Sequence, residues 1–194
     1  MAARDIAHKA DCMLWLFAYT FMLRVPSEAL PAARGDQRLA QGAAEQAVIW
    51  LDDDMLVLRL LRRKNKPHVS VLKRGCTCES QPRICLIHVL WEGFLRDLPV
   101  GRKPWAAHSS TSANDALRTA LSSLAVPSAN LYRCHDLRRG HARDLFDAGS
   151  PLEDTLRHGE WRGKAVRKYL DECDLEQQVV LEAVLESDDE QWIQ

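Results

Sequence analysis

The sequence has no run of about 18 uncharged apolar residues, which is the length that a membrane-spanning helix requires. Its apolar stretch at residues 13–23 is too short to cross a bilayer, and Asp5, Lys9 and Asp11 precede it, which argues against a signal peptide. Internal repeats and low-complexity segments are also absent. We therefore expect an intracellular protein with no membrane partner.

The six cysteines have no secretory signal beside them, so they indicate reduced thiols or metal ligands and not a framework of disulfides. The chain has 194 residues, of which 46% are hydrophobic and 27% charged. That length and composition fit one globular domain with a sizeable core, alone or followed by a tail.

Charge of one sign is missing from two segments. Residues 59–74 hold seven basic and no acidic side chains, whereas residues 171–194 hold nine acidic side chains and no Lys or Arg. The whole chain has a net charge of −1, so removing the nine acidic charges of the tail leaves about +8. An excess of that size on the remainder is a plausible footprint for nucleic acid.

Hydrophobic periodicity predicts a mainly α fold with a small three-stranded antiparallel sheet. Strands are expected at residues 47–51, 55–61 and 68–72, with turns at 52–54 and 62–67. A polar connector is expected at 37–45 and a loop at 98–110. Helices are expected at residues 5–24, 27–30, 83–97, 112–125, around 135–139 up to Gly149, around Tyr169, and at 174–186. Ser150, Pro151 and Glu153 form the pattern of a capping box before the helix that carries Tyr169.

His135 and Arg138 are three residues apart, so on a helix they share one face. Arginine presents a rigid fork to two phosphate oxygens, and histidine can move a proton near neutral pH. A tyrosine such as Tyr169, arriving from a later segment, can form a covalent bond to phosphorus. The three residue types together suit attack on a phosphate diester, although the short H-x-x-R pattern alone is common.

Five segments in chain order resemble the motifs of the tyrosine recombinases of the phage-integrase type, and enzymes of eukaryotic Crypton-type mobile elements are a candidate branch. They are residues 23–30 (LRVPSEAL), 62–66 (RRKNK), 135–139 (HDLRR), 158–162 (HGEWR) and 168–170 (KYL). The set spans about residues 20 to 170, most of the chain. It implies the fold of that family's catalytic domain.

The resemblance implies that Tyr169 attacks a DNA phosphate to give a 3′-phosphotyrosine and a free 5′-hydroxyl, without a metal or other cofactor for catalysis. Arg24 and Arg138 would neutralise the transition-state charge, and His135 would receive or orient the tyrosine proton. Glu28 would support Arg24 or the hairpin, although Pro26 lengthens the family's usual spacing by one.

Two roles have alternative candidates. Lys64 is the first candidate for the acid that protonates the leaving 5′-oxygen, and Lys66 is the second. The position that holds a histidine or tryptophan in the family matches Trp161, which we favour, or His158. Side chains expected to contact DNA are Arg62, Arg63, Lys66 and Arg139.

A separate group of Cys76, Cys78, Cys85 and His88 supplies four metal ligands within thirteen residues. Tetrahedral Zn²⁺ accepts three cysteines and one histidine, and a closed set of that kind is structural. The spacing matches no common zinc finger, so unrelated loop thiols and a histidine are the alternative interpretation.

We expect a catalytic domain at residues 1–173 and an acidic helix or tail at 174–194, without the N-terminal core-binding domain of the recombinases. The expected partner is double-stranded DNA, bound by a homo-oligomer, in the nucleus if the host is eukaryotic. The expected activity is DNA strand cleavage and rejoining, as in site-specific recombination. The alternatives are an inactive DNA-binding or interaction module that keeps the fold, and nicking and closing like that of a type IB topoisomerase.

Overall fold

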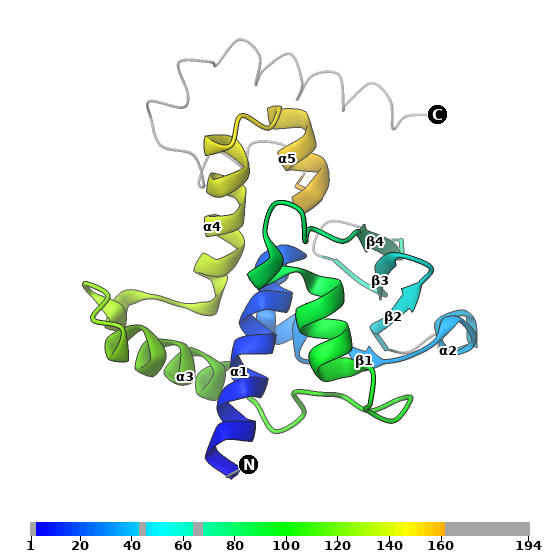
Figure 1. Ribbon diagram of the computed structural model, residues 1–194, viewed down its shortest axis with the longest axis horizontal. Coiled ribbons are helices and arrows are strands. Elements are labelled where there is room, and N and C mark those ends of the chain that lie inside the picture. Colours follow the sequence, from blue (N-terminus) through cyan, green and yellow to red (C-terminus); the bar gives the residue numbers. More distant parts are fainter. Residues whose placement is uncertain (1–2, 43–45, 64–67, 162–194) are drawn as a thin grey trace. The chain divides into compact units, whose positions relative to one another are not determined.

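The computed structural model describes residues 3–42, 46–63 and 68–161 (Figure 1). The chain divides after Arg138 into two compact units, and the division falls within helix α4. The helices are α1 (Ala3–Thr20), η1 (Val25–Ala29), α2 (Gln37–Gly42), η2 (Pro82–Ile84), η3 (Leu86–Leu95), α3 (Ser110–Ser123), η4 (Ala129–Leu131), α4 (Cys134–Asp147) and α5 (Leu152–Gly159). The strands are β1 (Ala33–Arg34), β2 (Val48–Asp52), β3 (Met55–Leu60) and β4 (Ser70–Arg74).

The sheet has four strands in the order β1-β2-β3-β4, and it is mixed. β2, β3 and β4 are antiparallel neighbours, but β1 pairs parallel to β2. The prediction of a three-stranded antiparallel sheet is therefore wrong. The sequence did not predict β1, because a strand of two residues has no alternating pattern of its own. Its place in the sheet depends on backbone hydrogen bonds to the segment around β2.

Those backbone bonds run from the Ala33 N–H to the Ala47 carbonyl and from the Gly35 N–H to the Ile49 carbonyl, each at 2.8 Å. A Cβ atom on Gly35 would lie 2.1 Å from Cγ1 of Val48, so a side chain there would push β1 and β2 apart. The close approach of the two strands requires glycine at this position.

The core of the first unit lies between the helices and the sheet. Helices α1 and η3 pack side by side, and η3 also packs against β3 (Figure 1). Trp105, from the predicted loop at 98–110, is fully buried in this core. Its ring stacks on Phe17 at a centroid distance of 5.1 Å, and its Nε1–H donates to the Ala10 carbonyl at 2.9 Å. A buried indole whose N–H is satisfied contributes a large apolar contact area without an unpaired donor.

Several helix boundaries differ from the predicted ones for identifiable reasons. The polar connector contains α2, which Asp36 caps by accepting from the Leu39 N–H at 2.7 Å. The helix predicted at 83–97 is interrupted by the extended backbone of Cys85, and η3 begins at the next residue. The capping box predicted at Ser150 is wrong, since Pro151 is the N-cap of α5 and no side chain caps it.

A capping box occurs instead at the start of α3, where Ser109 and Ser112 each accept from the backbone N–H of the other. Among the helices that the structure describes, none combines the length and the apolar character needed to cross a membrane.

Candidate functional site

The site begins at the C-terminus of α1, where the chain turns sharply. The Met22 N–H donates to the Tyr19 carbonyl at 3.0 Å, and the Leu23 N–H donates to the Ala18 carbonyl at 2.8 Å. This is the Schellman pattern, which places a left-handed residue just after the helix. That residue is Met22, with φ of 50°, where glycine is usual. A strained backbone at a non-glycine residue persists only where surrounding contacts hold it.

Glu28 is placed beside this turn by η1, which has Pro26 in its first turn. Its carboxylate accepts from the Arg24 backbone N–H at 2.9 Å through Oε2, and from Arg24 Nη1 at 3.2 Å through Oε1. The Glu28 side chain is only 1% exposed. A carboxylate taken out of water in this way requires cationic or N–H partners on all sides.

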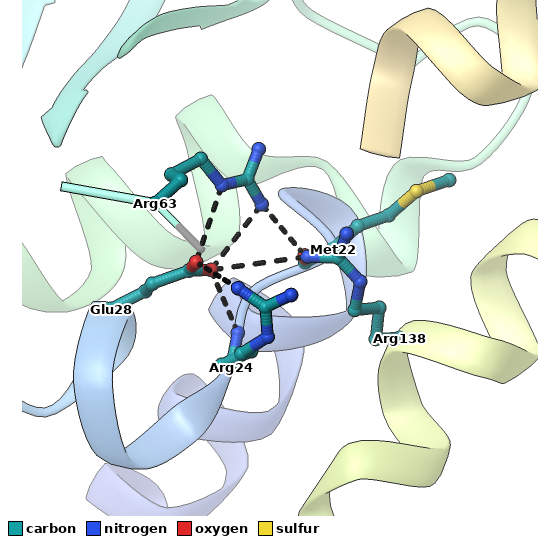
Figure 2. A network of polar contacts seen from close by, with 5 residues as sticks. All are labelled: Met22, Arg24, Glu28, Arg63 and Arg138. Atoms are coloured by element: carbon teal, nitrogen blue, oxygen red, sulfur yellow. Dashed lines mark hydrogen bonds and ion pairs between the residues drawn. The ribbon is translucent and has the colours of Figure 1, made fainter. Parts of the chain in front are cut away.

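Arg63 supplies a second cation to Glu28 (Figure 2). It follows β3, and its Nε and Nη2 donate to the two carboxylate oxygens at 3.3 Å each. This two-point contact is the geometry in which arginine binds carboxylates most strongly. Arg63 Nη2 also donates to the Met22 carbonyl at 3.2 Å.

Arg138 brings the third cation from α4 (Figure 2). Its Nη1 donates to the Met22 carbonyl at 2.5 Å and lies 3.9 Å from Oε2 of Glu28. The left-handed turn thus aims one carbonyl at two guanidinium groups, which accounts for the strained conformation of Met22. We call Met22, Arg24, Glu28, Arg63 and Arg138 the arginine cluster.

Three guanidinium charges and one carboxylate give the arginine cluster a formal charge of +2. The side chains of Arg63 and Arg138 are each 2% exposed, whereas that of Arg24 is 29% exposed. Guanidinium groups present paired N–H donors that match the oxygens of a phosphate, so the cluster is suited to contact an anion of that kind. Arg24 is the member through which such an anion could be reached from solvent.

A pocket borders this region, since Ser27 and Arg62, which precede Glu28 and Arg63 in the chain, both line it. Arg59 and Lys103 line it too, and its described lining contains no acidic side chain. Two of the seven basic residues at 59–74, Arg59 and Arg62, therefore line this pocket together with Lys103 from the loop before α3.

The other predicted site residues are placed as follows. His135 and Arg139 are exposed on α4, one on each side of the buried Arg138 along the chain. Arg62 is exposed, whereas its neighbour Arg63 turns inward to Glu28. Nothing in the sequence distinguished these two arginines, because alternation in an extended chain says only that neighbours face opposite sides. Lys64, Lys66 and Tyr169 lie outside the described residues.

His158 and Trp161 belong to the second unit and are described within it alone. His158 is exposed at the end of α5, with Nδ1 2.8 Å from the Asp154 carbonyl, so that nitrogen donates. Trp161 is buried and follows Glu160, which ends the helix with φ of 48°.

The predicted metal ligands do come together, and the Cys₃His cluster of Cys76, Cys78, Cys85 and His88 could hold a metal ion. The four ligand atoms all lie within 4.8 Å of one another. His88 Nδ1 is 3.0 Å from Cys78 Sγ, 3.4 Å from Cys85 Sγ and 3.7 Å from Cys76 Sγ. The extended Cys85, between η2 and η3, lets its thiol meet the loop that follows β4.

The hydrogen bonds within the Cys₃His cluster favour the thiolate of Cys85 and the neutral thiol of Cys78. Burial raises the pKa of Cys85, but hydrogen bonds from the backbone and ring of His88, from the Thr77 N–H and from Cys78 outweigh it and lower that pKa to about 5. Donation to Cys85 raises the pKa of Cys78 to about 12. Metal ligands must be thiolates, so one ligand is already in its binding form at neutral pH.

The chain matches no protein-family model, no curated protein and no solved structure.

Proposed function

We propose that this protein cleaves and rejoins DNA strands through a 3′-phosphotyrosine at Tyr169. The observation that carries the proposal is that Arg24 and Arg138, which are far apart in the sequence, both lie within 4 Å of the Glu28 carboxylate. These are the two arginines that the recombinase resemblance assigns to the scissile phosphate. Their convergence on one small volume is what such chemistry needs.

In the proposed step, the Tyr169 oxygen attacks phosphorus and the bond to the 5′-oxygen breaks. The phenol proton passes to His135, and the leaving 5′-oxygen takes a proton from Lys64, or from Lys66 as the alternative donor. Attack of a 5′-hydroxyl on the phosphotyrosine then reverses the step, so the phosphodiester energy is retained. Preorganised arginine contacts to the pentavalent phosphorus would lower the barrier by about 3–4 kcal/mol each, the typical worth of such donors.

Glu28 and Arg63 have supporting parts in this proposal. Glu28 holds Arg24 through both its backbone N–H and its guanidinium, and Arg63 neutralises the carboxylate from the other side. Arg24 is thereby fixed while 29% of its side chain stays open to a phosphate. Such a fixed cation loses little conformational entropy when the phosphate binds.

One observation favours a second function, that of a DNA-binding module without catalysis. Arg138 is 2% exposed and donates to the Met22 carbonyl, a protein acceptor that occupies one of its N–H groups. In a module of this kind the arginine cluster would stabilise the fold, while Arg59, Arg62 and Lys103 of the bordering pocket would contact the DNA backbone.

A nicked suicide duplex separates the two functions. We expect the natural sequence to form a covalent protein–DNA adduct that Tyr169→Phe does not form. Tyr132→Phe is the matched control, because it removes a phenol from an exposed tyrosine outside the arginine cluster. If none of the three proteins forms the adduct but all of them bind the duplex, the proposed strand cleavage is wrong and the DNA-binding module without catalysis is supported. Relaxation of supercoiled plasmid without exchange between duplexes would indicate the topoisomerase-like reaction.

For the Cys₃His cluster we propose Zn²⁺ in a closed, structural site. With Zn–S near 2.3 Å and Zn–N near 2.0–2.1 Å, tetrahedral geometry places two sulfurs about 3.8 Å apart and a sulfur about 3.5–3.6 Å from the nitrogen. The Cys76–Cys85 Sγ distance is 3.7 Å, and the three distances from His88 Nδ1 to the sulfurs are 3.0–3.7 Å. Four protein ligands leave no position for substrate, so the metal would stabilise the fold and take no part in the chemistry.

Metal analysis of the purified chain tests this assignment. We expect one zinc per chain in the natural sequence and less than a tenth of that in Cys78→Ser. Cys12→Ser is the control, since Cys12 lies in α1 outside the cluster, and it should keep the full metal content. Equal zinc in the natural protein and in Cys78→Ser would place the metal elsewhere.

A further inference from the structure

Arg74, the last residue of β4, connects the neighbourhood of the metal ligands with the turn that carries Met22. Its Nε donates to the Thr20 carbonyl at 3.1 Å, and its guanidinium lies 5.3 Å from the centre of the Phe21 ring. Thr20 is the last residue of α1, so Arg74 satisfies a carbonyl at a helix C-terminus, where a cation is also favoured by the helix dipole.

The contacts of Arg74 and of the arginine cluster lie on successive residues of one turn. Arg74 contacts Thr20 and Phe21, and the next carbonyl, that of Met22, accepts from Arg63 and Arg138. Phe21 is fully buried, so its ring cannot shift without disturbing the core. Arg74 and the two arginines that donate to the Met22 carbonyl therefore hold adjacent residues of the same turn.

The metal ligands are placed to fix Arg74 in turn. Cys76 follows Arg74 after a single glycine, and His88 lies on η3, which packs beside α1. A metal bound by both residues would tie the end of β4 to η3, and hence to the helix whose C-terminus Arg74 holds. The described contact between Cys76 and His88 themselves is a thiol–imidazole distance of 3.7 Å, a weak interaction.

We propose that metal occupancy of the Cys₃His cluster sets the phosphate affinity of the arginine cluster, with Arg74 as the residue that couples the two sites. This inference rests on the proposed function in that the phosphate is taken to be that of DNA. Coupling between sites is typically 5- to 150-fold in affinity. Metal removal therefore weakens binding of a duplex oligonucleotide by about that factor, and saturating DNA strengthens metal binding by the same factor.

Two readouts test the coupling in the full chain. The first is the affinity for one duplex oligonucleotide at fixed low salt, measured with zinc-loaded and chelator-treated protein. The second, which needs no DNA, is hydrogen exchange at the amides of residues 22–24. Those three N–H groups donate to the Tyr19 carbonyl, the Ala18 carbonyl and the Glu28 carboxylate, so they report directly on the turn. We expect metal removal to accelerate their exchange at least tenfold.

Arg74→Met keeps the aliphatic stem and removes the guanidinium, so it keeps the metal ligands intact. We expect this variant to bind zinc, to exchange the amides of residues 22–24 as fast as the metal-free protein, and to bind DNA equally with and without zinc. Arg83→Met is the matched control, because Arg83 is an exposed arginine of η2, inside the metal-binding loop. It should behave like the natural sequence.

The outcomes separate the coupling from the proposed function. Unchanged exchange at residues 22–24 in both the metal-free protein and Arg74→Met would overturn the coupling, whether or not DNA binds. Unchanged DNA affinity upon metal removal in a protein that does bind DNA would overturn it as well. Accelerated exchange together with no DNA binding in any form would support the structural coupling and overturn the proposed function.

Discussion

Glu28→Gln should destabilise the folded protein strongly, because Glu28 is a buried carboxylate that contacts three arginines. The change keeps the shape of the side chain but removes a carboxylate that lies within 4 Å of Arg24, Arg63 and Arg138. It also places an amide N–H₂ group beside guanidinium donors. Removing one partner of a buried ion pair typically costs about 3–5 kcal/mol, because the remaining charge loses part of its compensation.

That cost is a large part of the roughly 5–15 kcal/mol by which a typical domain is stable. Because a loss of 1 kcal/mol lowers the melting temperature of a 150–250-residue protein by about 2–4 °C, we expect a fall of roughly 6–20 °C. Urea unfolding followed by circular dichroism measures the free energy of unfolding directly.

Glu92→Gln is the matched control for this measurement. Glu92 is also a glutamate paired with an arginine four residues away, Arg96, but the two side chains are 36% and 56% exposed. Exposed pairs of this kind contribute about 0.3–0.5 kcal/mol. A loss below about 1 kcal/mol in Glu28→Gln, close to that of the control, would refute the view that the carboxylate holds the arginine cluster together.

A double-mutant cycle tests the same view from the other partner. Arg63→Met alone removes one of the cations that contact Glu28. The double variant with Glu28→Gln removes the carboxylate and the Arg63 guanidinium together, so neither charge is left without the other. We expect the double variant to be more stable than the sum of the two single losses predicts, by about 1–3 kcal/mol. Strict additivity would mean that Glu28 and Arg63 do not interact in solution.

Three smaller predictions concern positions outside the arginine cluster. Gly35→Ala should destabilise the protein by more than about 1 kcal/mol, because the new Cβ would lie 2.1 Å from Val48 Cγ1. Gly140→Ala has open space around the new Cβ and should stabilise helix α4 by about 0.5–1 kcal/mol. Urea midpoints that shift in the same direction for both variants would contradict this pair of predictions. Ser109→Ala should cost about 1 kcal/mol by removing the capping box of α3, and an unchanged melting curve would disprove that role. Burial raises the pKa of Cys134 from 9.0 to about 11, so between these pH values the folded protein keeps a proton that the unfolded chain loses. The free energy of unfolding should therefore fall as pH rises from 9 to 11. The fall should be smaller in Cys134→Ala, and an identical fall in both proteins would show that the thiol does not contribute.

The spacing of the ligand-type residues was sufficient to predict the Cys₃His cluster. Four ligand-type side chains within thirteen residues predicted a site, and the structure brings their ligand atoms within 4.8 Å. Closeness in sequence limits how far apart such residues can lie, so the prediction needed little knowledge of the fold. The extended conformation of Cys85 was not predicted, because the apolar spacing after residue 83 favoured one uninterrupted helix. In the structure Cys85 is extended, and its thiol reaches the other metal ligands from that position.

The arginine cluster required more than spacing. The sequence by itself determined which arginines were candidates, and the periodicity of its apolar residues located α1, α3 and the strands β2, β3 and β4 to within a few residues. The tertiary structure alone decided that β1 joins the sheet in parallel, that Arg63 turns toward Glu28 while Arg62 stays in solvent, and that Met22 adopts a left-handed turn. Helices and strand segments follow from neighbours along the chain, whereas the burial of a charge depends on which distant groups can compensate for it, and only the folded chain brings those groups together.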